Sequence, residues 1–229
     1  MSFDEVCEQL RALARPEAIE GMARVGITPA HALGVSMPDP RALARRIGRD
    51  HELALRLWSE GWRETRILAS LVSDPKPATP DLLDHWAADF DNWEVCDQCC
   101  MNLFERTPFA WNEAPEWSGR GEEFIKRAGF VLMARLAYAG HKASDTDYEP
   151  FLAAIAREAA DGRNSVKKAV NWALRDIGKR NPALCARAVA VAELVHAQGS
   201  PSARWIATDA LRELRSDAVQ RRLSRVQGK

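Results

Sequence analysis

The sequence has little of what marks secreted, membrane-bound or disulfide-rich proteins. Its five cysteines are an odd number in a chain of 229 residues, so we expect free thiols and a reducing, cytoplasmic location. No run approaches the roughly 18 consecutive apolar residues of a membrane span, and the opening residues MSFDE predict no signal peptide. The apolar share of 46% and the charged share of 28% are those of a globular chain and exclude a disordered one.

Common catalytic and metal-binding signatures are also missing. The chain has no G-x-S-x-G of hydrolases, no P-loop and no G-x-G-x-x-G of dinucleotide-binding proteins. Its five histidines form no H-x-x-x-H pair, and Cys96-x-x-Cys99-Cys100 lacks the second Cys or His pair of a zinc site. We therefore prefer core packing of these cysteines to a metal or redox role, and we expect no metal.

The net charge of zero hides a division along the chain. Residues 1–119 hold 12 Lys and Arg against 20 Asp and Glu, a net charge of −8. Residues 120–229 hold 20 against 12, a net charge of +8. The basic half predicts attraction to a polyanion, and a solvated mixture of helix faces is the alternative interpretation.

Apolar residues recur with the 3.6-residue period of helices, and segments that alternate as strands do are missing. Capping residues before proline predict helix starts at Thr79-Pro80, Asn181-Pro182 and Ser200-Pro201, and Asp147-Tyr148-Glu149-Pro150 predicts another. The predicted helices span 2–14, 16–24, 40–48, 50–60, 62–73, 79–88, 93–106, 120–140, 147–161, 163–180, 182–198 and 202–215.

Five of these helices form a coarse repeat with steps of 31, 30, 41 and 36 residues, found by aligning Arg66, Asp97, Arg127, Lys168 and Arg204. The steps fall around the periods of helical-pair repeats, in which stacked pairs bury a continuous core. We therefore predict an all-α fold: a HEAT-like solenoid of antiparallel helix pairs, forming one monomeric domain over 1–229. Within it, we expect capping helices in 1–48, the repeats in 49–216 and a basic tail in 217–229.

In such a solenoid, the inner helix of each pair lines a concave surface with its polar side chains. The inner helices are predicted in 64–72, 95–104, 125–137, 166–178 and 202–214. The last three of these helices carry five cations that we expect to form a basic stripe along the concave surface: Arg127, Lys168, Arg175, Arg204 and Arg212.

Eight tryptophans stand against two tyrosines. Trp58, Trp62 and Trp86 fit apolar stripes and are predicted core residues. Trp93 and Asp97 are four residues apart and fall on one helix face, where they are either a site or simply a packed ring and a surface charge. The spacing recurs at Trp172…Asp176 and Trp205…Asp209, so it is a weak signal alone.

Taken together, the motifs of residues 20–215 resemble those of the AlkD-like DNA alkylation repair glycosylases. The matching pieces are Gly26-Ile27, Gly34-Val35, Leu57-Trp58, Glu64-x-Arg66, the segment DNWEVCD at 91–97, FIKRA at 124–128 and VKKAVNWALRD at 166–176. The resemblance implies a HEAT-like solenoid that releases N3- or N7-alkylated purines from duplex DNA without a metal or a cofactor. It also implies a cytoplasmic, nucleoid-associated protein.

The resemblance assigns roles to single residues. Asp97 would be the catalytic carboxylate, Trp93 and Trp172 the indoles that contact the lesion nucleotide, and Arg127 the cation that grips the backbone nearby. Phosphate contacts would come from four further cations of the basic stripe, namely Lys168, Arg175, Arg204 and Arg212. The alternative is a non-catalytic helical-repeat scaffold that binds DNA or a protein partner.

These residue types suit the implied reaction. Alkylation at N3 or N7 gives the purine a positive charge, so its departure needs no general acid. A carboxylate can stabilise the oxocarbenium character of the sugar and position water, and indole faces attract a cationic base.

Overall fold

The computed structural model describes residues 1–138 and 142–227. Within these ranges the chain is all-helical and forms no strand, as predicted. No helix among the described residues combines the length and apolar character needed to cross a bilayer.

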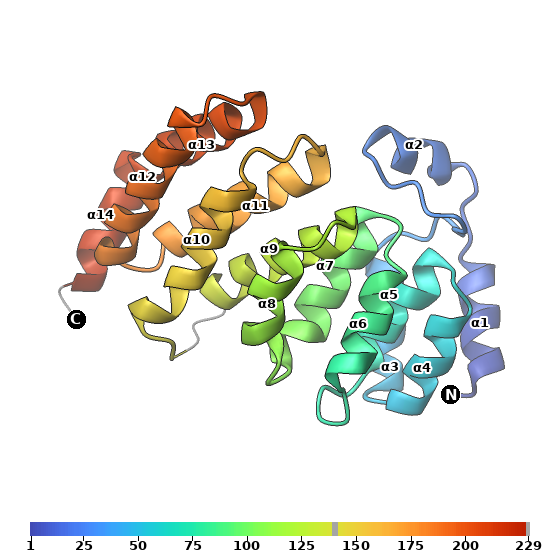
Figure 1. Cartoon of the computed structure of the whole chain (residues 1–229). Helices are drawn as coiled ribbons and strands as arrows, with labels where there is room; N and C mark the ends of the chain where they lie inside the picture. Colours follow the sequence, from blue (N-terminus) through green and yellow to red (C-terminus); the bar gives the residue numbers. More distant parts are fainter. Residues whose placement is uncertain (139–141, 228–229) are drawn as a thin grey trace. The chain divides into compact units, whose positions relative to one another are not determined.

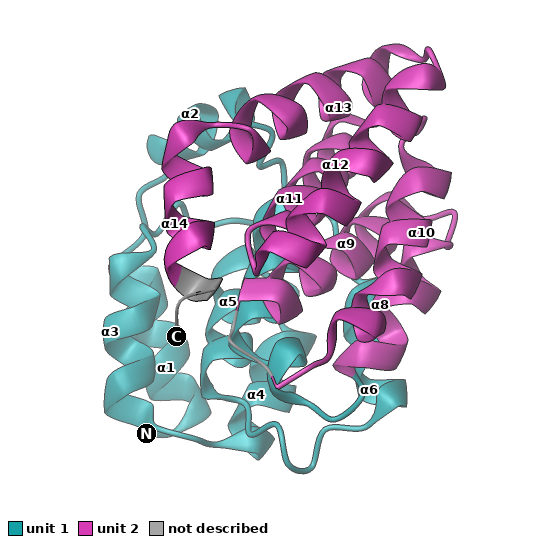
Figure 2. Cartoon of the chain, turned by 90° about the vertical axis from the view of Figure 1, so that its left-hand side faces the viewer, with its two compact units in different colours: residues 1–109 teal, residues 110–229 magenta. Residues whose placement is uncertain are grey.

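The chain divides into two compact units, residues 1–109 and 110–229 (Figure 2). Unit 1 contains α1 (Phe3–Ala12), α2 (Ala18–Arg24), α3 (Pro38–Ile47), α4 (His51–Ser59), α5 (Arg63–Val72), α6 (Pro80–Ala88), α7 (Trp93–Asn102) and the 3-10 helix η1 (Phe104–Arg106). Unit 2 contains α8 (Ala110–Ser118), α9 (Glu123–Tyr138), η2 (Asp145–Tyr148), α10 (Glu149–Glu158), α11 (Asn164–Gly178), α12 (Pro182–Ala197), α13 (Pro201–Leu214) and α14 (Asp217–Gln227).

In unit 1, α5 is the central helix and packs against α3, α4 and α7 (Figure 1). Aromatic stacking joins α4 to α6, since the rings of Trp58 and Trp86 lie 4.1 Å apart with a 2° angle between their planes. The indole Nε1 of Trp58 donates a 2.8 Å hydrogen bond to Asp89. Both rings are buried, as predicted, and they join α4, which packs against α5, to α6.

In unit 2, α9, α11 and α13 form a row in which α11 packs against both others (Figure 1). The outer helix α12 packs against α11 and α13, and α8 packs against α9. Pairs stacked in this way match the predicted helical repeat. Trp111 and Phe151 stack in the core between α8 and α10, with ring centroids 5.2 Å apart.

Most predicted helices have the expected bounds within a few residues. Three capping predictions are confirmed: Thr79, Asn181 and Ser200 each accept a hydrogen bond from the backbone N–H three residues later. Each satisfies a donor that the first helical turn leaves unpaired. The fourth differs, because α10 begins at Glu149 and its capping position, Tyr148, makes no side-chain cap.

Other predictions need correction. The predicted helix 93–106 ends at Asn102, because Leu103 leaves helical geometry and a separate 3-10 turn follows. Helix α8 was not predicted, since Pro115 lies inside it, and α14 occupies most of the predicted tail. Part of the predicted helix 120–140 lies outside the described residues. Trp62 is half-buried against His31 rather than in the core.

Candidate nucleic-acid interface

Helix α7 carries both Trp93 and Asp97, one helical turn apart. Trp93 is half-buried, whereas Asp97 is only 6% exposed. On its other sides α7 packs into the core through Cys96 and Cys99, both fully buried as predicted. A carboxylate held at such low exposure must be compensated by neighbouring groups.

The Trp93 indole is attached to the end of α2. Its Nε1 donates a 3.1 Å hydrogen bond to the carbonyl oxygen of Val25, the C-cap residue that directly follows that helix. The next residue, Gly26, has φ +78°, and its backbone closes the helix end with Ile27 in a Schellman motif. The indole therefore accounts for a carbonyl that the helix end leaves without a partner, and the bond fixes the edge of the ring.

Asp91 and Asn92 hold the start of α7. Asn92 caps the helix, accepting hydrogen bonds from the backbone N–H groups of Glu94 and Val95 at 3.0 and 3.1 Å. Its amide donates to Asp91 Oδ1 at 2.7 Å, and Asp91 Oδ2 accepts from the N–H of Ala30 at 3.0 Å. This chain of bonds ties the loop after α2 to the helix that carries Trp93 and Asp97.

A buried ion network anchors the same loop from α5. The Arg63 guanidinium lies 2.8 Å from Glu64 and 2.7 Å from Glu94, and all three side chains are buried. Glu64 accepts the backbone N–H groups of Leu33 and Val35 at 2.9 and 3.2 Å. Burial acts to lower the pKa of Arg63, but hydrogen bonds and charges of the two glutamates raise it above its usual value.

Gly34 completes this loop. Its φ is +76°, and an added Cβ would lie 2.1 Å from the backbone oxygen of Arg15. Only glycine permits so close a backbone approach. The loop after α2, whose first residues contact Trp93, therefore depends on glycine at two positions, Gly26 and Gly34.

In unit 2, α9 provides Arg127 and α11 provides Trp172. Arg127 is 6% exposed, and its guanidinium donates a 2.5 Å hydrogen bond to the backbone oxygen of Ser165, just inside α11. Trp172 is half-buried, and its Nε1 donates to Asp176 at 2.7 Å. Both side chains are held by hydrogen bonds to their neighbours. That Trp93, Asp97, Arg127 and Trp172 converge on one surface stays a prediction.

The predicted phosphate-binding cations fall into two groups. Lys168 and Arg204 are exposed and form no ion pair among the described residues. Arg175 lies 2.5 Å from Glu213 and 3.5 Å from Asp209, and Arg212 is paired with Asp209. The acidic side chains of α13 therefore already neutralise the second group.

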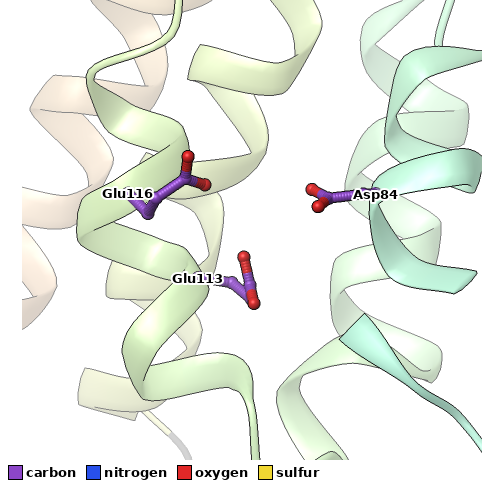
Figure 3. A group of neighbouring side chains, drawn as sticks. All are labelled: Asp84, Glu113 and Glu116. Atoms are coloured by element: carbon purple, nitrogen blue, oxygen red, sulfur yellow. The ribbon is translucent and has the colours of Figure 1, made fainter. Parts of the chain in front are cut away.

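Within either unit, the described residues hold no group of three neighbouring carboxylate, imidazole or thiol ligands. Figure 3 shows acidic side chains on two elements: Asp84 on α6, and Glu113 with Glu116 one turn apart on α8. Acidic groups of this kind are common on protein surfaces and assign no metal. None of the five cysteines forms a disulfide among the described residues and all are buried, which confirms their predicted packing role.

Sequence reasoning gave no role to Arg63, Glu64 or Asp91, although the last two lie in the motifs that carry the family resemblance. The signal was their position: a charged pair at the start of a predicted helix, and an acid before the capping Asn92. Their partners are backbone atoms of a distant loop, which no local pattern reveals.

The family model described as "DNA alkylation repair enzyme" matches residues 6–214. A solved structure shares the fold with a TM-score of 0.72 and 21% identity, over 85% of this chain and 83% of the other. It is described as a new family of proteins related to the HEAT-like repeat DNA glycosylases, with affinity for branched DNA structures. No curated protein matches the chain. Because the family model spans nearly all of both units, the chain belongs to the DNA alkylation repair enzyme family.

Proposed function

We propose that this protein is a DNA glycosylase that removes cationic N3- and N7-alkylated purines from duplex DNA. The observation that carries the proposal is Asp97: a carboxylate 6% exposed on α7, one turn from an anchored indole. Membership of a DNA alkylation repair enzyme family supports it.

In the proposed reaction, the bond between C1′ and the purine nitrogen breaks and its electron pair stays with the base. The alkylated base leaves as a neutral molecule, because its positive charge is cancelled. Water then forms the new C1′–O bond and releases a proton. Asp97 stabilises the developing positive charge on the sugar and orients the water.

Selectivity for damage arises from the two indoles. Trp93 and Trp172 present π faces to the lesion nucleotide, and a cationic base gains roughly 0.5–2 kcal/mol there that a neutral base does not. Hydrogen bonds to Val25 and Asp176 fix the polar edges of the two rings, so little rotational freedom is lost on binding.

Phosphate contacts come from unit 2 in this proposal. Arg127 binds the DNA backbone near the lesion. Lys168 and Arg204 bind phosphates directly, because neither has to break an ion pair with a carboxylate of the described residues first. Arg175 and Arg212 have to leave Asp209 or Glu213 first. Such contacts position the duplex without reading its sequence.

The proposal is tested by incubating the protein with a methylated duplex and identifying the released bases by mass spectrometry. We expect 7-methylguanine and 3-methyladenine to be released from many sequence contexts, and the neutral lesion hypoxanthine to stay bound in the DNA. Release of the neutral base at a similar rate contradicts the charge-based selectivity, and no release of any base contradicts glycosylase activity.

A second candidate is structure-specific DNA binding without catalysis. The similar solved structure favours it, since that protein is described by its affinity for branched DNA. It predicts tight binding of a junction, no base release and no effect of replacing Asp97. The same release assay therefore separates the two functions.

A further inference from the structure

Trp205 on α13 is 41% exposed and is the one exposed tryptophan among the described residues. The ammonium group of Lys167, on α11, lies 4.8 Å from the centre of its ring. The Trp205 indole N–H has no hydrogen-bond partner among the described residues, whereas those of Trp58, Trp93 and Trp172 each have one. This ring is thus neither buried nor anchored by its polar edge.

The contact belongs to a ladder between two parallel inner helices. Lys167 pairs with Trp205, Asn171 donates a 2.7 Å hydrogen bond to Asp209, and Arg175 lies 2.5 Å from Glu213. Each rung is four residues beyond the last on both helices. In two of these contacts the α13 residue is an acid, Asp209 or Glu213. In the first contact the α13 residue is Trp205 instead.

This replacement leaves positive charge at one end of the ladder. Lys167, Lys168 and Arg204 form no ion pair among the described residues. The first turns of α11 and α13 hold no acidic residue either. A ring with one cation 4.8 Å from its centre and two further cations at adjacent helix positions, none of them in an ion pair among the described residues, is suited to a nucleotide, whose base has a π face and whose phosphate is an anion.

We propose that Trp205, with Lys167, Lys168 and Arg204, is a binding site for an unpaired nucleotide at a branch, gap or single-stranded end of DNA. The exposed part of the indole stacks on the base, and the cations hold the flanking phosphates. A base inside an intact duplex offers no free face, so this site distinguishes branched DNA from continuous duplex.

The site is distinct from the proposed lesion contact at Trp172. By the ladder, Trp205 is level with Lys167, five residues before Trp172 on the neighbouring helix. A rise of about 1.5 Å per residue and a helix separation of about 9 Å place the two residues roughly 12 Å apart, measured between their positions on the helix axes. That separation corresponds to a few stacked nucleotides, so one strand can reach both rings.

This inference rests on the proposal that unit 2 binds DNA, and its test separates the two. Binding is measured by fluorescence anisotropy with a short duplex and with the same duplex carrying a short unpaired tail. The wild type is expected to bind the tailed DNA more tightly. Trp205→Ala should weaken binding of tailed DNA about fivefold or more and leave the duplex unchanged, whereas Trp205→Phe should retain most of the preference.

Tyr138→Ala is the matched control, since this aromatic ring is 72% exposed and has the Arg135 guanidinium 5.1 Å from its centre. It should leave both affinities unchanged. A preference for the tailed DNA that survives in Trp205→Ala overturns the Trp205 site alone. Equal wild-type binding of both DNAs also overturns it and leaves duplex binding intact, and binding of neither DNA overturns the DNA-binding proposal as well.

Discussion

The indole nitrogen of Trp93 lies 3.1 Å from the carbonyl oxygen of Val25, and this bond joins the proposed lesion-contacting ring to the end of α2. Helix α2 contains no buried residue. Its position therefore depends on contacts of its flanking segments, of which the Trp93 bond is one. Because this hydrogen bond couples the Trp93 ring to the end of α2, a substitution at either one is expected to change the position or mobility of the other.

Trp93→Phe tests this dependence, because phenylalanine keeps an aromatic face and removes the N–H donor. We expect faster amide hydrogen exchange in residues 18–27, since the Val25 carbonyl loses its partner, and a slower release of 7-methylguanine. Trp62→Phe is the control, as its half-buried ring contacts His31 rather than Val25. Unchanged exchange in Trp93→Phe contradicts a positioning role for the bond.

Arg63→Met tests the buried ion network. Removing the cation leaves Glu64 and Glu94 buried without their partner, and breaking such a pair lowers the free energy of unfolding by about 3–5 kcal/mol. Arg24→Met removes a cation from an exposed pair with Glu20 and should change stability little. Urea unfolding monitored by tryptophan fluorescence measures both, and equal effects are incompatible with the proposed anchoring.

The salt dependence of DNA binding distinguishes the two groups of cations. Each phosphate contact contributes about 0.9 to the slope of log affinity against log salt concentration. Lys168→Met and Arg204→Met should each reduce the slope by about that amount, because both side chains lack an ion-pair partner among the described residues. Arg175→Met should reduce it less, since Asp209 and Glu213 already neutralise Arg175. Equal reductions by all three variants argue against this division.

Acid should weaken the ion pairs that support α9. Burial acts to raise the pKa of Glu158, but hydrogen bonds from Lys126 and Arg157 lower it below its usual value of 4.5. Because the folded-state pKa is lowered, the pair stabilises the fold above about pH 4.5, and this contribution is lost as the pH falls through the folded pKa.

Unfolding free energies at several pH values check this expectation. The difference between wild type and Lys126→Met should be about 1–3 kcal/mol at neutral pH and should shrink below pH 4.5. Asp161, 3.6 Å from the Lys126 ammonium group, adds to the effect, because its pKa is lowered chiefly by hydrogen bonds from Arg163 and further by the charge of Lys126. A difference that stays constant down to pH 3 contradicts the assignment.

The helical fold was predictable because each helix carries its own periodicity and often its own cap. Thr79 and Asn181 show this, since the residue type alone indicates the helix start. The exceptions have physical reasons. Pro115 conceals α8, which packing against α9 stabilises. In α14, Val219, Leu223 and Val226 recur at helical spacing, but most of the other residues are charged or polar, and the segment was assigned to a basic tail.

The candidate site was predictable only in part. The spacing of Trp93 and Asp97 follows from helix geometry, and their shared helix is confirmed. What Trp93 binds was not predictable, because Val25 is 68 residues away in the sequence. The neutralisation of Arg175 also depends on a distant partner, Glu213 of α13. The net positive charge of the basic stripe is therefore smaller than its number of cations suggests.

The central claim is tested most directly by single-turnover release of 7-methylguanine by Asp97→Asn, with binding of the same methylated duplex measured in parallel. Glu105→Gln is the matched control, a buried carboxyl of similar exposure outside the proposed site. We predict that Asp97→Asn binds the duplex within a few-fold of wild type and releases the base at least about 100-fold more slowly, while Glu105→Gln retains both. Release by Asp97→Asn at the wild-type rate contradicts the account.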